Sequence, residues 1–197
     1  MQIGEPKTGQ TVVVSTGAGA VGSCVGQIAR IYGCHTIAIT GGEIKRQLCI
    51  DRFQFDAAVD YKREDFVDQL AAVCSKGIDI YFDNTSGSIS DAVMQHLNVG
   101  ARVIICGTAS IANWNPSPLG PRVERQILVK RARMQGFVIL DHRDHYAVAR
   151  AELADWVRRG LIHYEEEILN GIAHAPDAIA GLYRGENLGR RLIRVID

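Results

Sequence analysis

The sequence predicts an α/β protein built on a doubly wound parallel sheet. Short β-branched, apolar runs alternate with segments of helical spacing up to residue 140. This alternation is typical of parallel strands joined by right-handed crossover helices that cover both faces of a sheet. A glycine-rich turn also separates the first apolar run from the first helical segment. Ligands of such sheets bind at the carboxyl ends of the strands, so this turn is the first candidate site.

The elements follow one another from residue 11. Because each apolar run is as short as a buried parallel strand, we expect strands at 11–15, 35–40, 57–61, 78–83, 102–106 and 134–140. Between them, the recurrence of apolar residues predicts helices at 23–30, 43–52, 65–74, 90–97 and 124–131. A polar loop with Pro116, Pro118 and Pro121 precedes the last of these helices.

The pattern changes after residue 140. We expect an amphipathic helix at 146–159 whose inward side is formed by Ala147, Ala151, Leu153, Ala154 and Val157. Two segments of alternating polarity then predict antiparallel or edge strands at 163–169 and 191–196. A short helix is expected between them at 177–183. The chain thus divides into a dinucleotide-binding domain at 1–140 and a C-terminal α+β segment at 141–197. This segment is either a small cap or part of a substrate domain.

The turn after the first strand has glycines in G-x-G-x-x-G register at Gly17, Gly19 and Gly22. We expect Gly17 to permit the tight turn, Gly19 to let the backbone approach a pyrophosphate, and Gly22 to let the helix pack closely. The helix N-terminus adds free N–H groups and a positive dipole end. Glycine-rich turns are common, and a plain turn is the alternative. The position between a predicted strand and a predicted helix favours a Rossmann dinucleotide site.

The end of the second strand favours NADP(H) over NAD(H). An NAD site places an acidic residue at this strand tip to hold the ribose hydroxyls. Here two glycines, Gly41 and Gly42, are followed by Glu43 and then by Lys45 and Arg46. Room and positive charge suit a 2′-phosphate. The alternative is that Lys45 and Arg46 simply lie in the solvated first turn of a helix. Glu43 is acidic, but its position suits a charge at a helix N-terminus better than a ribose ligand.

Composition excludes several function classes. With 22 basic and 22 acidic residues, we expect no nucleic-acid partner and no anionic membrane surface. The N-terminus lacks the features of a signal peptide, so the expected location is cytoplasmic. We expect no metal site: the odd number of scattered cysteines favours buried thiols in a reducing compartment. His142 and His145 are expected in a loop and at a helix start, with Asp144 as the N-cap. The cysteines are Cys24, Cys34, Cys49, Cys74 and Cys106.

Six motifs in order resemble the zinc-independent medium-chain dehydrogenases/reductases, in the group of NADPH-dependent alkenal, prostaglandin and curcumin reductases. The resemblance implies NADPH-dependent reduction of the C=C bond of α,β-unsaturated ketones or aldehydes. The motifs lie at 18–29, 42–45, 55–61, 81–84, 105–108 and 185–189.

The resemblance also implies which residues bind the cofactor. The diphosphate is expected on Ala20, Val21, Gly22 and Ser23, and the 2′-phosphate on Lys45 with Tyr61 close by. Asn84 is expected at a ribose, and Asn187 is expected to close over the cofactor. Without the resemblance, Asn84 reads as a strand-end turn residue and Asn187 as a helix cap. The nicotinamide half is expected beside Cys106, Gly107, Thr108, Ala109, Ser110 and Ile111, joined by the backbone of Phe137, Val138 and Ile139.

Two departures from the family matter for function. The relatives begin with a substrate domain that we do not find in this sequence. Val129 also stands where some mammalian relatives have a substrate-contacting tyrosine, so we assign no catalytic side chain. Three functions stay open: an enone reductase, an NADPH-binding module without turnover, and an oligomeric scaffold. The apolar sixth strand at 134–140 predicts a homodimer through its free edge.

Overall fold

The computed structural model describes residues 3–111 and 113–195. A six-stranded parallel sheet has the strand order β3-β2-β1-β4-β5-β6. The order reverses between β1 and β4, which is the switch point of a doubly wound sheet, so the predicted fold class is confirmed. The strands are β1 (Thr11–Ser15), β2 (His35–Thr40), β3 (Ala57–Asp60), β4 (Ile78–Asp83), β5 (Leu97–Ile105) and β6 (Arg133–Gly136).

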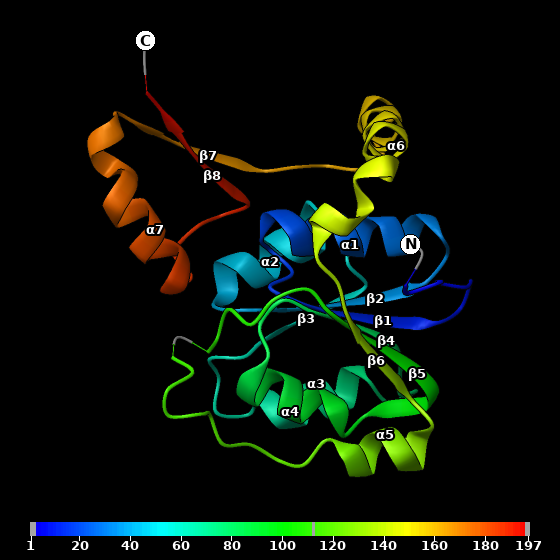
Figure 1. The fold of residues 1–197 in the computed structure, drawn as a ribbon. Helices are drawn as coiled ribbons and strands as arrows, with labels where there is room; N and C mark the ends of the chain where they lie inside the picture. Colours follow the sequence, from blue (N-terminus) through cyan, green and yellow to red (C-terminus); the bar gives the residue numbers. More distant parts are fainter. Residues whose placement is uncertain (1–2, 112, 196–197) are drawn as a thin grey trace.

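Helices cover both faces of this sheet. Figure 1 shows α1 and α2 on one face and α3, α4 and α5 on the other. Each face has its own buried cluster, one including Phe53 and Phe55 and the other Ile37 and Leu70. Successive strand residues point to opposite faces, so each of the strands β1 to β5 contributes residues to both clusters. The helices are α1 (Ala20–Ile31), α2 (Glu43–Asp51), α3 (Phe66–Val73), α4 (Gly87–Met94) and α5 (Glu124–Lys130).

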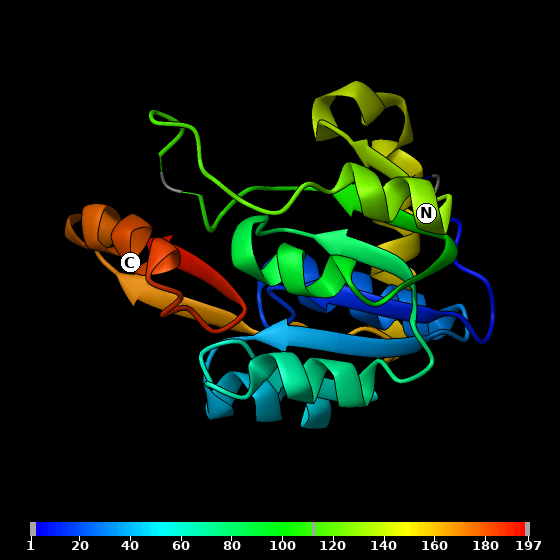
Figure 2. The same ribbon diagram turned by 90° about the horizontal axis from the view of Figure 1, so that it is seen from below.

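The C-terminal elements form a separate arrangement. Helix α6 lies over the α1 face, whereas β7, β8 and α7 extend away from the main sheet (Figures 1 and 2). Strands β7 and β8 form their own two-stranded sheet. These elements are the 3₁₀ helix η1 (Ile139–His145), α6 (Tyr146–Arg158), β7 (Glu166–Asn170), the 3₁₀ helix η2 (Ile172–His174), α7 (Ala175–Tyr183) and β8 (Arg190–Arg194).

One strand prediction was wrong in its extent, and another had left antiparallel and edge strands open. Among the described residues, β7 and β8 pair only with each other, so both are edge strands. They run parallel, because α7 between them provides the crossover that parallel strands need. Strand β6 ends at Gly136, opposite Ile105 at the end of β5. Beyond that pair the edge strand has no ladder partner, so residues 137–140 leave the sheet. Residues from Ile139 onward form η1.

Helix α6 begins and packs differently from the prediction. Residues up to His145 continue η1 directly into α6, and no side chain caps the helix, so Asp144 is not its N-cap. The predicted inward residues Ala147, Ala151, Ala154 and Val157 are exposed, and Leu153 alone of that set is half-buried. Instead, Val148, Ala149 and Glu152 face the pocket described below. Periodicity alone did not identify the pocket-facing side of α6, because this helix lies over a pocket and not against a packed core.

All five cysteines are free, with Cys34, Cys49 and Cys74 buried and Cys24 and Cys106 partly exposed. Within residues 3–111 and 113–195, no helix combines the length and apolarity needed to cross a bilayer.

Candidate functional site

The glycine-rich turn joins β1 to α1 at the carboxyl edge of the sheet. Thr16, with a φ of 56°, takes the left-handed position of the turn, so the role expected of Gly17 falls to its neighbour. Gly17 instead allows close packing, since an added Cβ would lie 2.5 Å from Ala38 Cβ on β2. A Cβ on Gly22 would lie 2.1 Å from the Thr16 carbonyl oxygen. Gly22 therefore packs against the turn itself, more directly than against the sheet.

The N-terminus of α1 opens at this turn. Ser23 N–H donates to Gly19 O at 2.9 Å, so the amides of Ala20, Val21 and Gly22 have no intrahelical acceptor. The first turn contains no acidic residue. This combination favours an anion such as a diphosphate. The C-terminal segment passes beside it, because Gly189 forms a β-bridge with Gly19 and donates its N–H to Ala18 O at 3.0 Å.

The tip of β2 leads into α2 through Gly41 and Gly42. Arg46 binds Glu43 with both guanidinium arms, Nε to Oε2 at 2.7 Å and the terminal nitrogen to Oε1 at 2.5 Å. The hydrogen bond with Arg46 lowers the pKa of Glu43. The negative charge of Glu43 is therefore paired with Arg46. Of the two cations expected to be free at this strand end, Lys45 and Arg46, only Lys45 has no acidic partner within the described residues.

Lys45 lies between α2 and the C-terminal segment. Its Nζ donates to the Gly185 carbonyl oxygen at 2.7 Å. Burial, followed by the charges of Lys62 and Arg191, lowers the pKa of Lys45. Tyr61 lies close to the same two segments. A Cβ added to Gly41 would be 2.9 Å from the Tyr61 ring, and one added to Gly185 would be 3.9 Å from the Tyr61 hydroxyl. Lys45 and Tyr61 are thus brought together, as predicted, beside the Gly185–Gly189 segment.

The tip of β4 is organised by a carboxylate that sequence reasoning missed. Asp83 is 1% exposed and accepts hydrogen bonds from Ser90 Oγ at 2.5 Å, Tyr81 OH at 3.0 Å and the Ser86 amide at 2.8 Å. Burial, then the charge of Asp83, raises the pKa of Tyr81. An acid that ends a buried strand beside hydroxyl residues was a signal available in the sequence.

Asn84 continues from Asp83 and links the tips of β4 and β1. Its side-chain Nδ2 donates to Ser15 O at 2.7 Å, and its backbone amide donates to Ser15 Oγ at 2.8 Å. Asn84 is therefore held as a strand-end residue, which was its alternative interpretation. Its Oδ1 accepts no hydrogen bond from the described residues, so this oxygen keeps the capacity to accept one from a ligand hydroxyl.

The segment that follows β5 is hydrogen-bonded along the β4 tip. Cys106 N–H donates to Asp83 O at 2.7 Å, Ala109 N–H to Asn84 O at 3.2 Å and Ser110 Oγ to Thr85 O at 2.8 Å. A Cβ on Gly107 would lie 3.0 Å from Asn84 O. Burial, then the charge of Asp83, raises the pKa of the Cys106 thiol. The predicted stretch Cys106 to Ile111 and Asn84 therefore form one unit.

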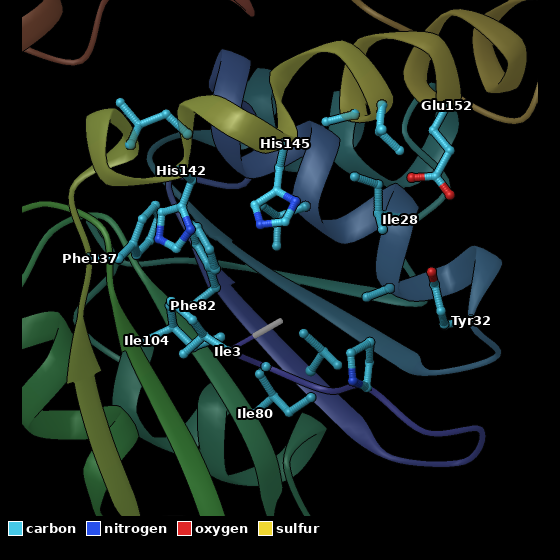
Figure 3. A pocket seen from close by; sticks show the side chains of 18 of the residues that line it. Ile3, Ile28, Tyr32, Ile80, Phe82, Ile104, Phe137, His142, His145 and Glu152 are labelled. Carbon is cyan, nitrogen blue, oxygen red and sulfur yellow. The ribbon is translucent and has the colours of Figure 1, made fainter. Parts of the chain in front are cut away.

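The remaining predicted residues, 137–139 and Asn187, do not belong to this unit. Phe137 and Ile139 line an apolar pocket of about 450 Å³ between the sheet, α1 and α6, together with Phe82 and Ile104. Figure 3 shows Phe137 and His142, whose rings meet edge to face, at one end of this pocket and Glu152 at the other. Val138 is exposed. Asn187 donates Nδ2 to Gly189 O at 2.8 Å, so it braces its own loop.

The described residues bring the predicted site together along one edge. The glycine-rich turn, the Lys45–Tyr61 pair and the Asn84–Ile111 unit all follow the carboxyl ends of β1, β2, β3, β4 and β5. The glycines leave room for a ligand to approach the backbone, and Lys45 supplies positive charge where the 2′-phosphate is expected. The roles of the individual residues stay predictions.

Comparison with known proteins gives a family match over residues 20–155, to the family described as zinc-binding dehydrogenase. The chain is 41% identical to the NADPH-dependent curcumin reductase of Escherichia coli, over 99% of this chain and 58% of that protein. It is 34% identical to the NADP-dependent 2-alkenal reductase of Nicotiana tabacum, over 98% of this chain and 57% of that protein. The chain therefore spans less than two thirds of the length of these relatives.

A solved structure resembles the whole described fold. CurA from Vibrio vulnificus, in complex with NADPH, superimposes with a TM-score of 0.95 at 45% sequence identity. The match covers 100% of this chain and 60% of CurA.

The family description names zinc, but the described side chains offer no site for this ion. Among residues 3–111 and 113–195, no group of three or more His, Cys, Asp and Glu side chains is placed to hold a metal ion.

Proposed function

The chain belongs to the zinc-binding dehydrogenase family, and on this premise we propose that it is the NADP(H)-binding part of an enone or alkenal reductase. The observation that carries the proposal is the tip of β2. There an acidic ribose ligand is absent from the strand end, Glu43 is paired with Arg46, and Lys45 is held beside Gly185. Similarity to the curcumin and alkenal reductases supports the substrate class, an α,β-unsaturated ketone or aldehyde.

When bound, NADPH supplies the reducing equivalent for the C=C bond. We propose that the chain binds and orients this cofactor. The free amides of α1 face the diphosphate, Lys45 the 2′-phosphate, and Asn84 a ribose hydroxyl. The segment Cys106–Ile111 and the backbone at Phe137–Ile139 flank the nicotinamide half, and the brace at Asn187 keeps the Gly185–Gly189 segment over the cofactor. No side chain is nominated as acid or base.

The first experiment titrates the chain with NADPH and NADH by fluorescence or calorimetry. We expect clearly tighter binding of NADPH, because only NADPH carries the 2′-phosphate that Lys45 would bind. Equal affinities would remove the argument from the β2 tip.

An NADPH-binding module without turnover is a second candidate. The chain spans 58% of the length of the curcumin reductase, and productive positioning of a substrate can supply ~7–11 kcal/mol of barrier lowering. We therefore expect the 197-residue chain by itself to bind NADPH but to reduce a simple alkenal poorly. Oxidation of NADPH followed with and without a co-expressed substrate domain of a relative separates the two candidates. Robust turnover by the chain alone would overturn the second.

We also propose that the C-terminal segment at 141–197 packs against a substrate domain. Large apolar side chains are exposed there on α6 and α7, including Val148, Ile179 and Tyr183. Exposed apolar surface of this kind is typical of a protein interface. Protection of α6 from hydrogen exchange by an added substrate domain is the expected result.

A homodimer through the edge of the sheet is the proposed assembly. Strand β6 pairs with β5 on one side only, and all four of its residues are exposed. An unpaired strand edge is suited to a second copy. Light scattering at micromolar concentration tests this, and a monomer mass would contradict it.

A cytoplasmic location is proposed from the five free thiols, since exported proteins favour disulfides. Cell fractionation tests it.

A further inference from the structure

The end of the candidate site near Lys45 contains several charged side chains, and most of them are paired with each other. Arg46, which follows Lys45 in the chain, is neutralised by Glu43 through two hydrogen bonds. The nearby acid Glu167 is likewise bound by Arg191, with oxygen–nitrogen distances of 2.8 and 3.1 Å. Neither pair leaves a free charge for a ligand.

Lys62 lies at this end of the site from a different strand. It follows Tyr61 directly after β3, and a Cβ on Gly41 would lie 3.0 Å from Lys62 Cε. The methylene stem of Lys62 therefore folds over the β2–α2 turn. No ion pair involves the ammonium group of Lys45 or of Lys62 within the described residues.

A buried acid fixes the backbone from which Lys62 extends. Asp60 Oδ1 accepts the Gly42 amide at 2.8 Å and the Lys62 amide at 3.0 Å. Asp60 is 7% exposed, so the two hydrogen bonds hold the β2 and β3 ends in one geometry. The Lys62 side chain thus starts from a defined position beside the glycines.

We propose that Lys62 is a second specificity-determining residue for the 2′-phosphate of NADP(H), acting together with Lys45 beside the Gly41–Gly42 turn. This inference rests on the proposed cofactor. Two ammonium groups without acidic partners repel each other, and the charge of Lys62 contributes to lowering the pKa of Lys45. A phosphate monoester carries about −1.5 to −2 near pH 7. Its binding between the two lysines converts that repulsion into two favourable contacts.

The test measures the dissociation constants of NADPH and NADH for the 197-residue chain and its variants. We expect Lys62→Gln to weaken NADPH about tenfold, equivalent to about 1.4 kcal/mol, and to change NADH less than about twofold. Lys62→Arg should restore most of the preference for NADPH. The matched control is Arg63→Gln, which removes one positive charge at the next residue, where Arg63 is paired with Asp65. This control should retain NADPH binding.

Each outcome decides the inference. NADPH preference that survives Lys62→Gln, but is lost in Lys45→Gln, overturns the role of Lys62 and leaves the proposed function intact. Equal weakening of NADPH and NADH by Lys62→Gln would show a structural role only and would also overturn it. If the unmodified chain bound NADPH no more tightly than NADH, both the proposed function and this inference would be wrong.

Discussion

The main sheet and the C-terminal elements are stabilised in different ways. Strands β1 to β5 bury side chains completely, such as Val13 and Ile37 at 0% exposure. In η1, α6 and β7, by contrast, no residue is buried, and the buried residues of α7 are the small Ala178 and Gly181. Hydrophobic burial is the main contribution to folding free energy, so the sheet region is expected to hold the stability of this chain.

The C-terminal elements are attached to the sheet region by a few specific contacts. Gln27 on α1 exchanges two hydrogen bonds with the His163 backbone, at 2.7 and 2.9 Å. Lys45 donates to Gly185, and Gly189 donates to Ala18. These contacts reach the glycine-rich turn and the proposed 2′-phosphate site. We therefore expect cofactor binding and the placement of the C-terminal elements to affect each other.

The largest effect is expected from a core substitution in the sheet region. Phe53 is 0% exposed, and Phe53→Ala should lower the free energy of unfolding by about 3–5 kcal/mol through lost burial and a cavity. Urea denaturation measures this. The control Tyr164→Ala, at a side chain that is 59% exposed, should change it by less than about 0.5 kcal/mol. Similar losses at both sites would break the comparison.

Lys45→Ala should weaken NADPH binding by about 1.5–3 kcal/mol, the range for a hydrogen bond to a charged group, and leave NADH nearly unchanged. The same substitution removes the hydrogen bond to Gly185. We therefore also expect faster hydrogen exchange in the Gly185–Gly189 segment. Calorimetry and exchange measurements test the two effects separately. Unchanged exchange would show that the C-terminal segment is held without Lys45.

Gln27→Ala removes both hydrogen bonds to His163. At about 0.5–1.5 kcal/mol for each bond, the expected loss is about 1–3 kcal/mol, concentrated in the attachment of the C-terminal elements. Limited proteolysis should cut near residues 160–165 sooner, while β1 to β5 keep their protection. Cleavage at an unchanged rate would mean that this contact does not attach α6 and β7.

The smallest effect is expected in the β7–β8 sheet and depends on pH. The hydrogen bond from Arg191 lowers the pKa of Glu167 below its ordinary value. A lowered carboxyl pKa stabilises the folded state above the unfolded value of about 4.3, and this stabilisation is lost as the pH falls through the folded value. Because Glu167 is about one third exposed, Glu167→Gln should cost less than about 1 kcal/mol at pH 7. Exchange of the β8 amides should show that difference at pH 7, and the difference should shrink as the pH falls below about 4.3.

Local sequence signals determined the sheet region and much of the candidate site. Apolar runs with helical segments between them predict β1 to β4 close to their observed positions, because burial on both faces leaves a continuous apolar pattern. For β5 only the second half was predicted, since the strand begins at Leu97, five residues before the expected start. Gly17 and Gly22 are required where a Cβ would collide with Ala38 or Thr16. Lys45 could be predicted because a cation near the second strand end is itself a local feature of the cofactor site.

Only the tertiary structure decided which charges are free and where the chain leaves the sheet. The pairing of Arg46 with Glu43, the hydrogen bonds gathered on Asp83 and the position of Lys62 over Gly41 join residues whose side-chain directions no periodicity specifies. Strand β6 ends where β5 offers no further partner. The exposed side of α6 depends on the hollow beneath it. Sequence patterns report the burial of each element, whereas these features depend on distances between elements that form only when the chain is folded.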